Sequence, residues 1–217
     1  METPAADDPK GPGRSLAMVL FDRFELLDVC GPLEVFGHLS DRYSIELVGP
    51  AIGPVTSAQG PALVATASYD GAPTPELVMV PGGPGTRILS LDPAFLAWLQ
   101  QWASPASYLT SVCTGSGLLA AAGLLDGFRA TSNKRAFEWA RSQGPLVEWV
   151  PEARWVEDAN RWTSAGVAAG MDMSLALVAH LDGPEVAQGV ADRVEYDWHR
   201  DPTWDPFAAH NGLVPGS

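Results

Sequence analysis

The chain has 217 residues, of which 46% are hydrophobic and 18% charged, a composition typical of one globular domain. Its formal net charge is −13, from 26 acidic and 13 basic side chains, so no broad basic surface is left to neutralise nucleic-acid phosphates or anionic lipid. Nucleic acid and membranes are therefore not expected as partners.

The first residues predict a tail rather than a folded element. Residues 1–14 mix Pro, Gly, Asp and Lys with almost nothing to bury, which indicates a disordered segment before a single domain at 15–217. The start has no basic and apolar regions of a secretory signal, and no apolar run approaches the roughly 20 residues that span a bilayer. We therefore predict a cytoplasmic protein.

Short apolar runs rich in β-branched residues, each followed by Gly, Pro or Asp, predict strands buried on both faces. Since helical patterns lie between them, the alternation favours a mainly parallel α/β sheet. The predicted strands are residues 15–22, 43–49, 76–80 and 108–112.

Two helices are predicted between these strands. Residues 31–40 have Pro32 near the expected first turn, and residues 92–104 begin with Asp92 as N-cap and Pro93 at the first helical position. Both features are typical of helix starts.

The remaining chain predicts decoration of the sheet and two further helices. Residues 199–217 are loop-like, but Trp204, Pro206 and Phe207 are too apolar to remain free, so we expect this segment to lie against the body or a partner subunit. The hairpins are predicted at 55–69 and 153–166, and the helices at 168–183 and 183–198.

Cys113 lies where the predicted strand 108–112 meets a run of small residues. Gly115, Ser116 and Gly117 allow the close backbone approach of a tight strand-to-helix turn, which is a nucleophile elbow in cysteine form. Such a turn exposes the side chain above the carboxyl ends of the strands, and the helix N-terminus favours the thiolate, so we expect a lowered pKa. The alternative is a buried cysteine that only fills space.

Backbone donors are predicted at the same edge of the sheet. The strand 76–80 runs into Pro81, Gly82 and Gly83, whose N–H groups are expected to be free to hold a developing negative charge. Because Pro-Gly-Gly also ends many strands without any function, this signal depends on its pairing with the elbow.

Asp28 follows the first strand and precedes a glycine and a helix. Its carboxyl can reach the carboxyl edge of the sheet, although a solvated or helix-capping acid is an equal alternative. Glu25 and Glu34 are rival carboxylates on the same segment.

Metal binding is not expected. Cys30 and Cys113 are predicted to be free thiols, and two thiols are too few for a zinc site of the CxxC…CxxC type. Asp172 is expected to stabilise the first turn of its helix rather than to act in catalysis. Surface or packing roles are expected for the four histidines, His38, His180, His199 and His210.

The segments "LLDVCGPLEVFG", "VMVPGG" and "SVCTGSGLLAAAGLLDGFRAT", in this order, resemble the DJ-1/ThiJ/PfpI superfamily, also described as glutamine-amidotransferase-like. The sequence looks most like the branch that contains isocyanide (isonitrile) hydratases. The resemblance implies a flavodoxin-like three-layer α/β sandwich, usually a homodimer, with Cys113 as nucleophile and Asp28 as its acidic partner. Thr114 matches the Cys-Thr pair of the hydratase-like members. No cofactor is expected.

The chain also departs from some relatives. Protease-like members carry a histidine directly after the cysteine, which is absent here, so peptidase chemistry is not expected. Many relatives have a further histidine where this chain has Asn133, which argues against a Cys-His dyad. Asn133 either orients the substrate by hydrogen bonds or caps a helix, and Asp28 is the main candidate proton carrier.

The resemblance implies hydration of a small organic isocyanide to an N-substituted formamide. Cys113 would attack the isocyanide carbon while Asp28 delivers a proton and later activates water. A carboxyl that touches a thiolate should have its pKa raised. The alternatives are action on reactive aldehydes such as methylglyoxal, and a non-catalytic sensor in which Cys113 is oxidised to sulfinate.

Overall fold

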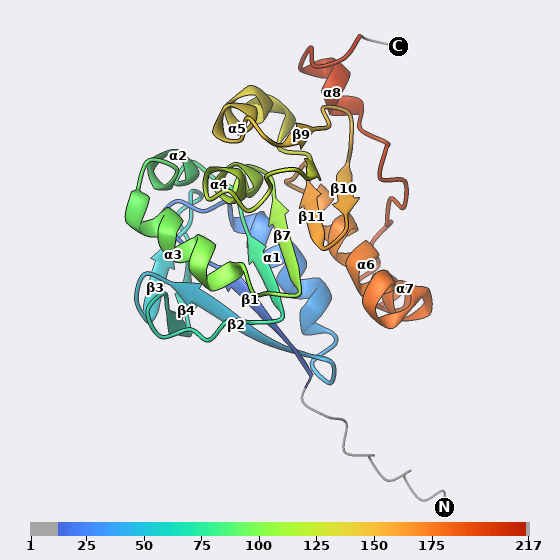
Figure 1. Ribbon diagram of the computed structural model, residues 1–217. Coiled ribbons are helices and arrows are strands. Elements are labelled where there is room, and N and C mark those ends of the chain that lie inside the picture. The colour runs from blue at the N-terminus through green and yellow to red at the C-terminus, as the bar shows by residue number, and fades with distance from the viewer. Residues whose placement is uncertain (1–12, 216–217) are drawn as a thin grey trace, which may run out of the picture.

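The computed structural model describes residues 13–215, arranged around a central sheet (Figure 1). The seven strands run in the order β10-β11-β7-β6-β1-β2-β5. Neighbouring strands are parallel except for the antiparallel pair β10 and β11 at one edge. The strands are β1 Arg14–Val19, β2 Tyr43–Gly49, β5 Ala67–Ser68, β6 Leu77–Val80, β7 Tyr108–Val112, β10 Trp155–Asp158 and β11 Arg161–Ser164.

The four predicted strands form the middle of this sheet as β1, β2, β6 and β7. All four residues of β6 are buried, as are the last four of β1 and of β7. Their continuous apolar sequence is typical of parallel strands covered on both faces. The mainly parallel sheet is therefore confirmed.

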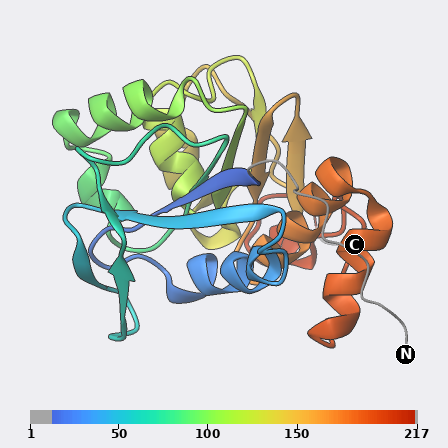
Figure 2. The same ribbon diagram turned by 90° about the horizontal axis from the view of Figure 1, so that it is seen from below.

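Helices cover both faces of the sheet, as Figure 2 shows. One layer contains α1, α6 and α7, which contact one another, and the other contains α4 with α2, α3 and α5 packed around it. This helix–sheet–helix arrangement confirms the predicted three-layer sandwich. The bounds are α1 Leu26–Gly37, α2 Thr86–Leu89, α3 Pro93–Ala103, α4 Gly115–Ala121, α5 Phe137–Gln143, α6 Ala169–Asp182 and α7 Pro184–Arg193.

Two helix predictions differ in their boundaries. The α1 helix begins at Leu26, so Pro32 lies inside it rather than near its first turn. The missing N–H of this proline costs one intrahelical bond, but five buried side chains, Phe36 among them, fix α1 on the sheet. The α7 helix ends at Arg193, before the predicted 198. At α3 the prediction is confirmed, because the Asp92 carboxylate accepts two backbone hydrogen bonds there.

Both predicted hairpins are present. β10 and β11 extend the main sheet, whereas β3 (Gly53–Thr56) and β4 (Ala62–Ala65) form a separate antiparallel pair. A further short parallel pair, β8 (Arg129–Ala130) and β9 (Glu148–Trp149), lies between the elbow helix and α6 in the chain.

The prediction of a tail over residues 1–14 is wrong at its C-terminal end. Arg14 is the first residue of β1, and its Nη1 lies 2.8 Å from Asp182 Oδ1 at the end of α6. Arg14 is therefore part of the folded domain, which the composition of residues 1–14 did not indicate. The rest of the predicted tail, residues 1–12, lies outside the described residues.

The C-terminal segment packs on the body, as expected from its apolar residues, and contains the short helix α8 (Pro206–His210), which was predicted as loop. The Asp205 carboxylate caps α8 by accepting from the Phe207 N–H at 2.9 Å. The Trp204 ring stacks on His199 with ring centroids 4.4 Å apart. The segment therefore runs along the molecule from the end of α7 to α8 (Figure 1).

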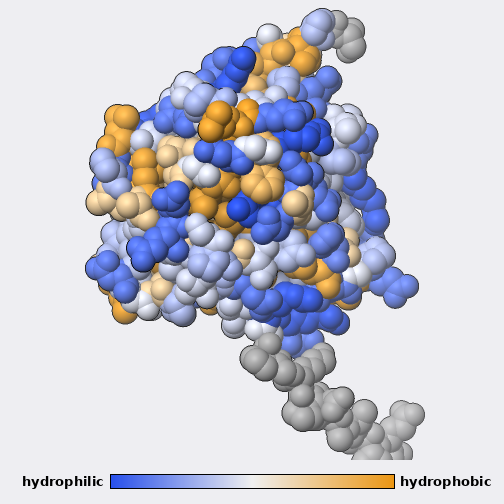
Figure 3. Space-filling view, viewed as in Figure 1, coloured by the Kyte–Doolittle hydropathy of each residue, from blue (hydrophilic) through white to orange (hydrophobic). Residues whose placement is uncertain are grey.

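The outer surface is mixed in character. On the face seen in Figure 3, hydrophobic residues gather in separate patches among hydrophilic ones. Within residues 13–215, no helix has both the length and the apolar character needed to cross a membrane.

Candidate active site

Cys113 lies on the turn between β7 and α4, as predicted. Its φ of +58° falls in the left-handed region, which is uncommon for a non-glycine residue and is strained. The Cys113 N–H donates to the Ser164 carbonyl at 3.1 Å, so the end of β11 holds the turn. The strained conformation identifies the turn as a nucleophile elbow.

Three glycines allow this turn to be compact. A Cβ on Gly115 would lie 2.1 Å from the Val80 carbonyl oxygen, and a Cβ on Gly82 or Gly166 would lie 2.8 or 2.5 Å from the Cβ of Cys113. No real side chain fits at such distances. The ends of β6 and β11 therefore press against the cysteine from two sides.

Asp28 lies in the first turn of α1 and is fully buried. Its Oδ2 accepts a hydrogen bond from the Gly82 N–H at 2.8 Å, while its Oδ1 has no hydrogen-bond partner among the described residues. The nearby Cys113 thiol interacts with this carboxyl. The structure thus brings Asp28 and Cys113 together at the carboxyl edge of the sheet, as the sequence predicted.

Burial changes the acidity of both groups. It raises the pKa of Asp28 well above its usual range, against a smaller lowering by the Gly82 N–H. Burial, followed by the Asp28 charge, also raises the pKa of Cys113. The predicted direction for the Asp28 pKa is confirmed, but the predicted cause, the thiolate charge, is wrong, because burial raises this pKa and the contact with Cys113 lowers it. The predicted lowering of the Cys113 pKa is also wrong, because desolvation of the sulfur outweighs the start of α4. Burial therefore favours the protonated form of each group in this pair.

The backbone donors after β6 are not free, contrary to the prediction. The Gly82 N–H is taken by Asp28, and the Gly83 N–H donates to Thr114 Oγ1 at 3.0 Å. The Thr114 N–H instead faces the Cys113 sulfur, where it acts to lower the pKa of the thiol. Gly82 and Gly83 therefore position the pair, and Thr114 supplies the donor beside the sulfur.

A cavity of about 570 Å³ opens in front of Cys113, a size typical of small-molecule sites. Of the predicted site residues, Thr114, Gly83 and Asn133 lie on its wall, whereas Asp28 and Gly82 lie behind the cysteine. The complete lining is Glu25, Gly83, Pro84, Arg87, Cys113, Thr114, Asn133, Arg135 and Val167.

Two arginines on this wall, Arg87 and Arg135, were not predicted from the sequence. A signal was present, because Arg87 shortly follows the predicted Gly82–Gly83 pair and Arg135 lies two residues after Asn133. The rival acids separate in the structure: Glu25 lines the cavity, whereas Glu34 is exposed and pairs with His38 at 2.9 Å.

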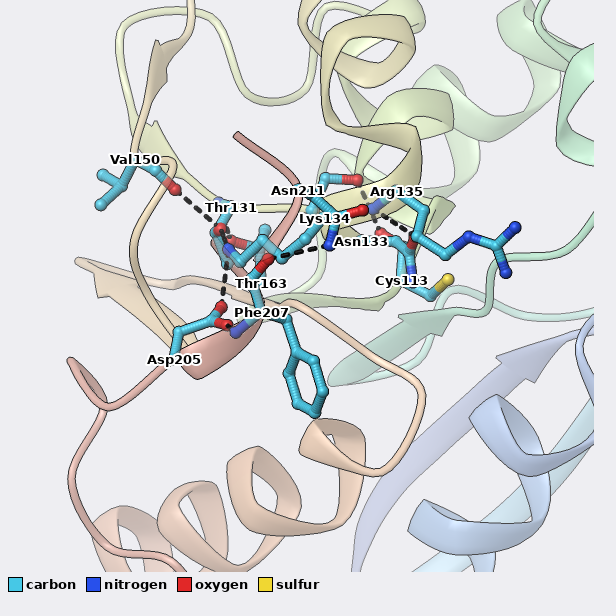
Figure 4. A network of polar contacts seen from close by, with 11 residues as sticks. Cys113, Thr131, Asn133, Lys134, Arg135, Val150, Thr163, Asp205, Phe207 and Asn211 are labelled. Atoms are coloured by element: carbon cyan, nitrogen blue, oxygen red, sulfur yellow. Dashed lines mark hydrogen bonds and ion pairs between the residues drawn. The ribbon is translucent and has the colours of Figure 1, made fainter. Parts of the chain in front are cut away.

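Asn133 faces the cavity and also caps the short 3-10 helix η1 (Lys134–Ala136), because its Oδ1 accepts from the Arg135 N–H at 3.1 Å. The capping alternative is therefore correct. Next to it, the Ser132 hydroxyl donates to the Cys113 carbonyl at 3.0 Å, which ties this loop to the elbow. Figure 4 shows the loop and the cysteine together.

A second cavity, of about 850 Å³, adjoins the first and shares Asn133, Arg135 and Val167 with it. Trp204 and Phe207 of the C-terminal segment line its outer side. The segment is anchored there by a buried ion pair, Lys134 Nζ to Asp205 Oδ2 at 3.1 Å, and Lys134 also donates to Thr131 Oγ1 at 2.7 Å (Figure 4).

The other singled-out residues are structural. Asp172 accepts from Arg154 Nε at 2.6 Å, from the Tyr196 hydroxyl and from the His199 N–H, so its carboxylate is fully engaged. Cys30 is a free thiol, as is Cys113, and does not line the cavity. Within residues 13–215, no three His, Cys, Asp or Glu side chains cluster as metal ligands would.

This combination of a parallel α/β sandwich and a cysteine elbow with an acid behind it matches a known family. Residues 14–180 match the DJ-1/PfpI family, and the chain belongs to that family. The solved structure of a ThiJ/PfpI family protein from Pseudomonas syringae superposes with a TM-score of 0.80 at 35% identity, covering 94% of this chain and 86% of that one. The flavodoxin-like fold is therefore shown.

Two curated relatives differ in what their names describe. An isonitrile hydratase of Pseudomonas putida is 38% identical over 83% of this chain and 78% of its own length. The HTH-type transcriptional regulator GbdR of Pseudomonas aeruginosa is 30% identical over 85% of this chain, which spans about half, 51%, of that regulator. The family thus contains both an enzyme and a regulator that resemble this chain.

Proposed function

We propose that the protein hydrates an organic isocyanide, R–NC, to the formamide R–NH–CHO, with Cys113 as nucleophile. The observation that carries the proposal is the buried contact of Cys113 with Asp28 at the elbow, where Cys113 lines a small-molecule cavity and burial favours the protonated form of both groups. An isocyanide carbon must receive both a nucleophile and a proton, and this pair supplies both.

In the first step a bond forms between the Cys113 sulfur and the isocyanide carbon, while the proton of the pair moves to that carbon. The product is a thioimidate, R–N=CH–S–Cys113. The starting state of this step is a pair that shares one proton, so transfer of that proton to the carbon leaves the sulfur bonded to the carbon and Asp28 as a carboxylate. The Thr114 N–H beside the sulfur stabilises the negative charge that develops there.

In the second step Asp28, now a carboxylate, takes a proton from water as the oxygen adds to the thioimidate carbon. Asp28 passes this proton to the nitrogen, the carbon–sulfur bond breaks, and the second proton of the water returns to the pair of Cys113 and Asp28. The formamide R–NH–CHO leaves, and the sum is R–NC plus one water. No group beyond the pair and water is required for this balance.

The relatives support the enzyme over the sensor. The P. putida relative named isonitrile hydratase shares more sequence with this chain than the regulator GbdR does. The predicted homodimer and cytoplasmic location remain part of this proposal.

The test is to incubate the reduced protein with an aryl isocyanide and to follow formamide formation by absorbance. We expect turnover that is abolished by Cys113→Ala and reduced at least about 100-fold by Asp28→Asn, because a positioned proton carrier contributes about that factor. The Cys30→Ala variant is the matched control and should retain turnover. Lactate formation from methylglyoxal without isocyanide turnover would instead identify an aldehyde-processing enzyme.

A further inference from the structure

Two arginines on the cavity wall have no part in the proposed reaction. Arg87 comes from α2 and Arg135 from η1, and both line the cavity with Cys113. Neither forms an ion pair with any residue in the described range 13–215. In a chain with twice as many acidic as basic side chains, two arginines left without an acid at one cavity indicate an anionic ligand.

Arg87 is fixed in position before any ligand arrives. Its Cζ lies 3.4 Å from the centroid of the Trp139 ring, and its Nη1 donates to Thr86 Oγ1 at 3.0 Å. The guanidinium interacts electrostatically with Cys113, so it lies close to the reacting sulfur. Since a guanidinium has five N–H donors, several remain for a ligand.

Arg135 lies where the two cavities meet, because it lines both of them. Figure 4 shows its side chain extending on the side of the Cys113 sulfur. The side chain is exposed and makes no hydrogen bond to another described residue, whereas its backbone is held by Asn133. It can therefore close on a ligand from the side opposite the α2 helix without breaking an existing contact.

The charge balance of the site favours a single negative charge on the ligand. Glu25 is the one acid lining the Cys113 cavity, and it is hydrogen-bonded to Gln59 at 2.6 Å. Two arginines and one glutamate leave a formal charge of about +1. The cations of the adjoining cavity are already paired, Lys134 with Asp205 and Arg154 with Asp172. A carboxylate matches this balance better than a doubly charged phosphate.

Resting on the proposed function, we propose that the R group of the isocyanide carries a carboxylate, which Arg87 and Arg135 bind while the isocyanide carbon lies at the Cys113 sulfur. The planar guanidinium groups match the two oxygens of a carboxylate. The substrate class is therefore isocyano-carboxylates. The carboxylate takes no part in the bonds that form and break.

The first test compares isocyanoacetate with its methyl ester, in which one methyl group replaces the negative charge. We expect kcat/KM to be at least about 10-fold higher for the carboxylate at low salt, as one charge-assisted hydrogen bond provides. Arg87→Gln and Arg135→Gln should each lower this ratio several-fold. Arg141→Gln is the matched control, since it removes an equal charge from an exposed residue paired with Glu138, and it should leave the ratio unchanged.

The second test measures binding without turnover. Calorimetry compares N-formylglycine, the expected product of isocyanoacetate, with its methyl ester on the wild-type protein and the same variants. A preference for the acid that is lost in Arg87→Gln and Arg135→Gln supports the carboxylate site even if neither isocyanide is hydrated, a result that would defeat only the proposed reaction. Equal binding of acid and ester, or a preference that survives both substitutions, overturns the inference. Arg87→Lys, which keeps the charge, should retain part of the preference.

Discussion

At the scale of single residues, the most informative group is Asp28, because its acidity is set by burial rather than by its neighbours in the sequence. A carboxyl with no exposed surface and one unpartnered oxygen is stable only when protonated. The same burial raises the pKa of Cys113. Holding this pair in the fold therefore costs stability as the pH rises.

The pH dependence of stability tests this interpretation. The pKa of Asp28 is raised in the folded protein. The stability that protonated Asp28 contributes to the folded state is therefore fully present below the ordinary carboxyl pKa of about 4, and it is lost as the pH rises toward the pKa of the folded state. We expect Asp28→Asn to gain stability over the wild type in that window, by up to about 1.4 kcal/mol per pH unit. Urea denaturation at several pH values measures the difference.

The matched control for this measurement is Asp70→Asn, at an exposed carboxylate. Its stability relative to the wild type should not change with pH. A parallel pH dependence of the Asp28→Asn and wild-type proteins would show that Asp28 ionises as it would in the unfolded chain, and would remove the basis for a shared proton.

The sequence predicted the position of this pair and the direction of the Asp28 pKa, but not the direction of the Cys113 pKa. The order of the segments around Asp28 and Cys113 was sufficient to place both at one edge of the sheet. The direction of the thiol pKa was missed because the burial of Cys113 arises from glycines in distant segments, Gly82 and Gly166. Arg87 and Arg135 were missed because they belong to short irregular elements with no periodic signal.

At the scale of elements, the elbow depends on how closely β6 and β11 approach the turn after β7. Gly166 follows β11 with a φ of +68°, and a Cβ there would lie 2.5 Å from the Cβ of Cys113. Nothing in the pattern of the β10–β11 hairpin distinguishes this glycine from an ordinary turn residue. Its importance comes only from the neighbouring strand.

We predict that Gly166→Ala moves the cysteine and lowers turnover at least about 10-fold, because the added methyl meets backbone and Cβ atoms that cannot rotate away. The control is Gly189→Ala in α7, where a Cβ meets nothing within 4 Å. That variant should retain turnover and gain about 0.5–1 kcal/mol of stability from helix propensity. Thermal unfolding measures the stability of the two variants, and the isocyanide assay measures their turnover. Full turnover by Gly166→Ala would contradict the proposed close packing.

Elements were easier to predict than their ends. The apolar runs predicted β1, β2, β6 and β7, and the Asp92 cap placed the start of α3. The start of α1 was missed because Pro32 was taken as a start signal, whereas tertiary packing of the preceding turn extends the helix to Leu26. The short helix α8 gave no periodic signal.

At the scale of the whole molecule, the C-terminal segment is joined to the site through the Lys134–Asp205 ion pair. Both side chains are almost completely buried, and burial lowers the pKa of Lys134 against the opposing effect of Asp205. Lys134 lies between Asn133 and Arg135, both of which line the Cys113 cavity. The outer wall of the second cavity is thus fixed to the loop beside the nucleophile.

We predict that Asp205→Asn destabilises the fold by about 3 kcal/mol, because it leaves the Lys134 charge buried without a partner. The amide can still cap α8, so the loss reports the ion pair. The double variant Lys134→Met with Asp205→Asn should lose less than the two single variants together. Urea denaturation of the wild type, the two single variants and the double variant completes this double-mutant cycle. The control is Glu138→Gln, which breaks an exposed ion pair and should cost under about 1 kcal/mol of stability. Strict additivity would exclude coupling between the two side chains.

The crowding of the cysteine by Gly82 and Gly166 has a consequence for protein engineering. Because the backbone that follows β6 and β11 confines Cys113 from two sides, single substitutions cannot re-aim the thiol without disturbing the fold. The wall residues Asn133, Arg135, Trp204 and Phe207 carry no such restriction. Libraries that change substrate range should therefore randomise those walls and leave the glycines untouched, so that the reacting group and the selectivity of the catalyst can be redesigned separately.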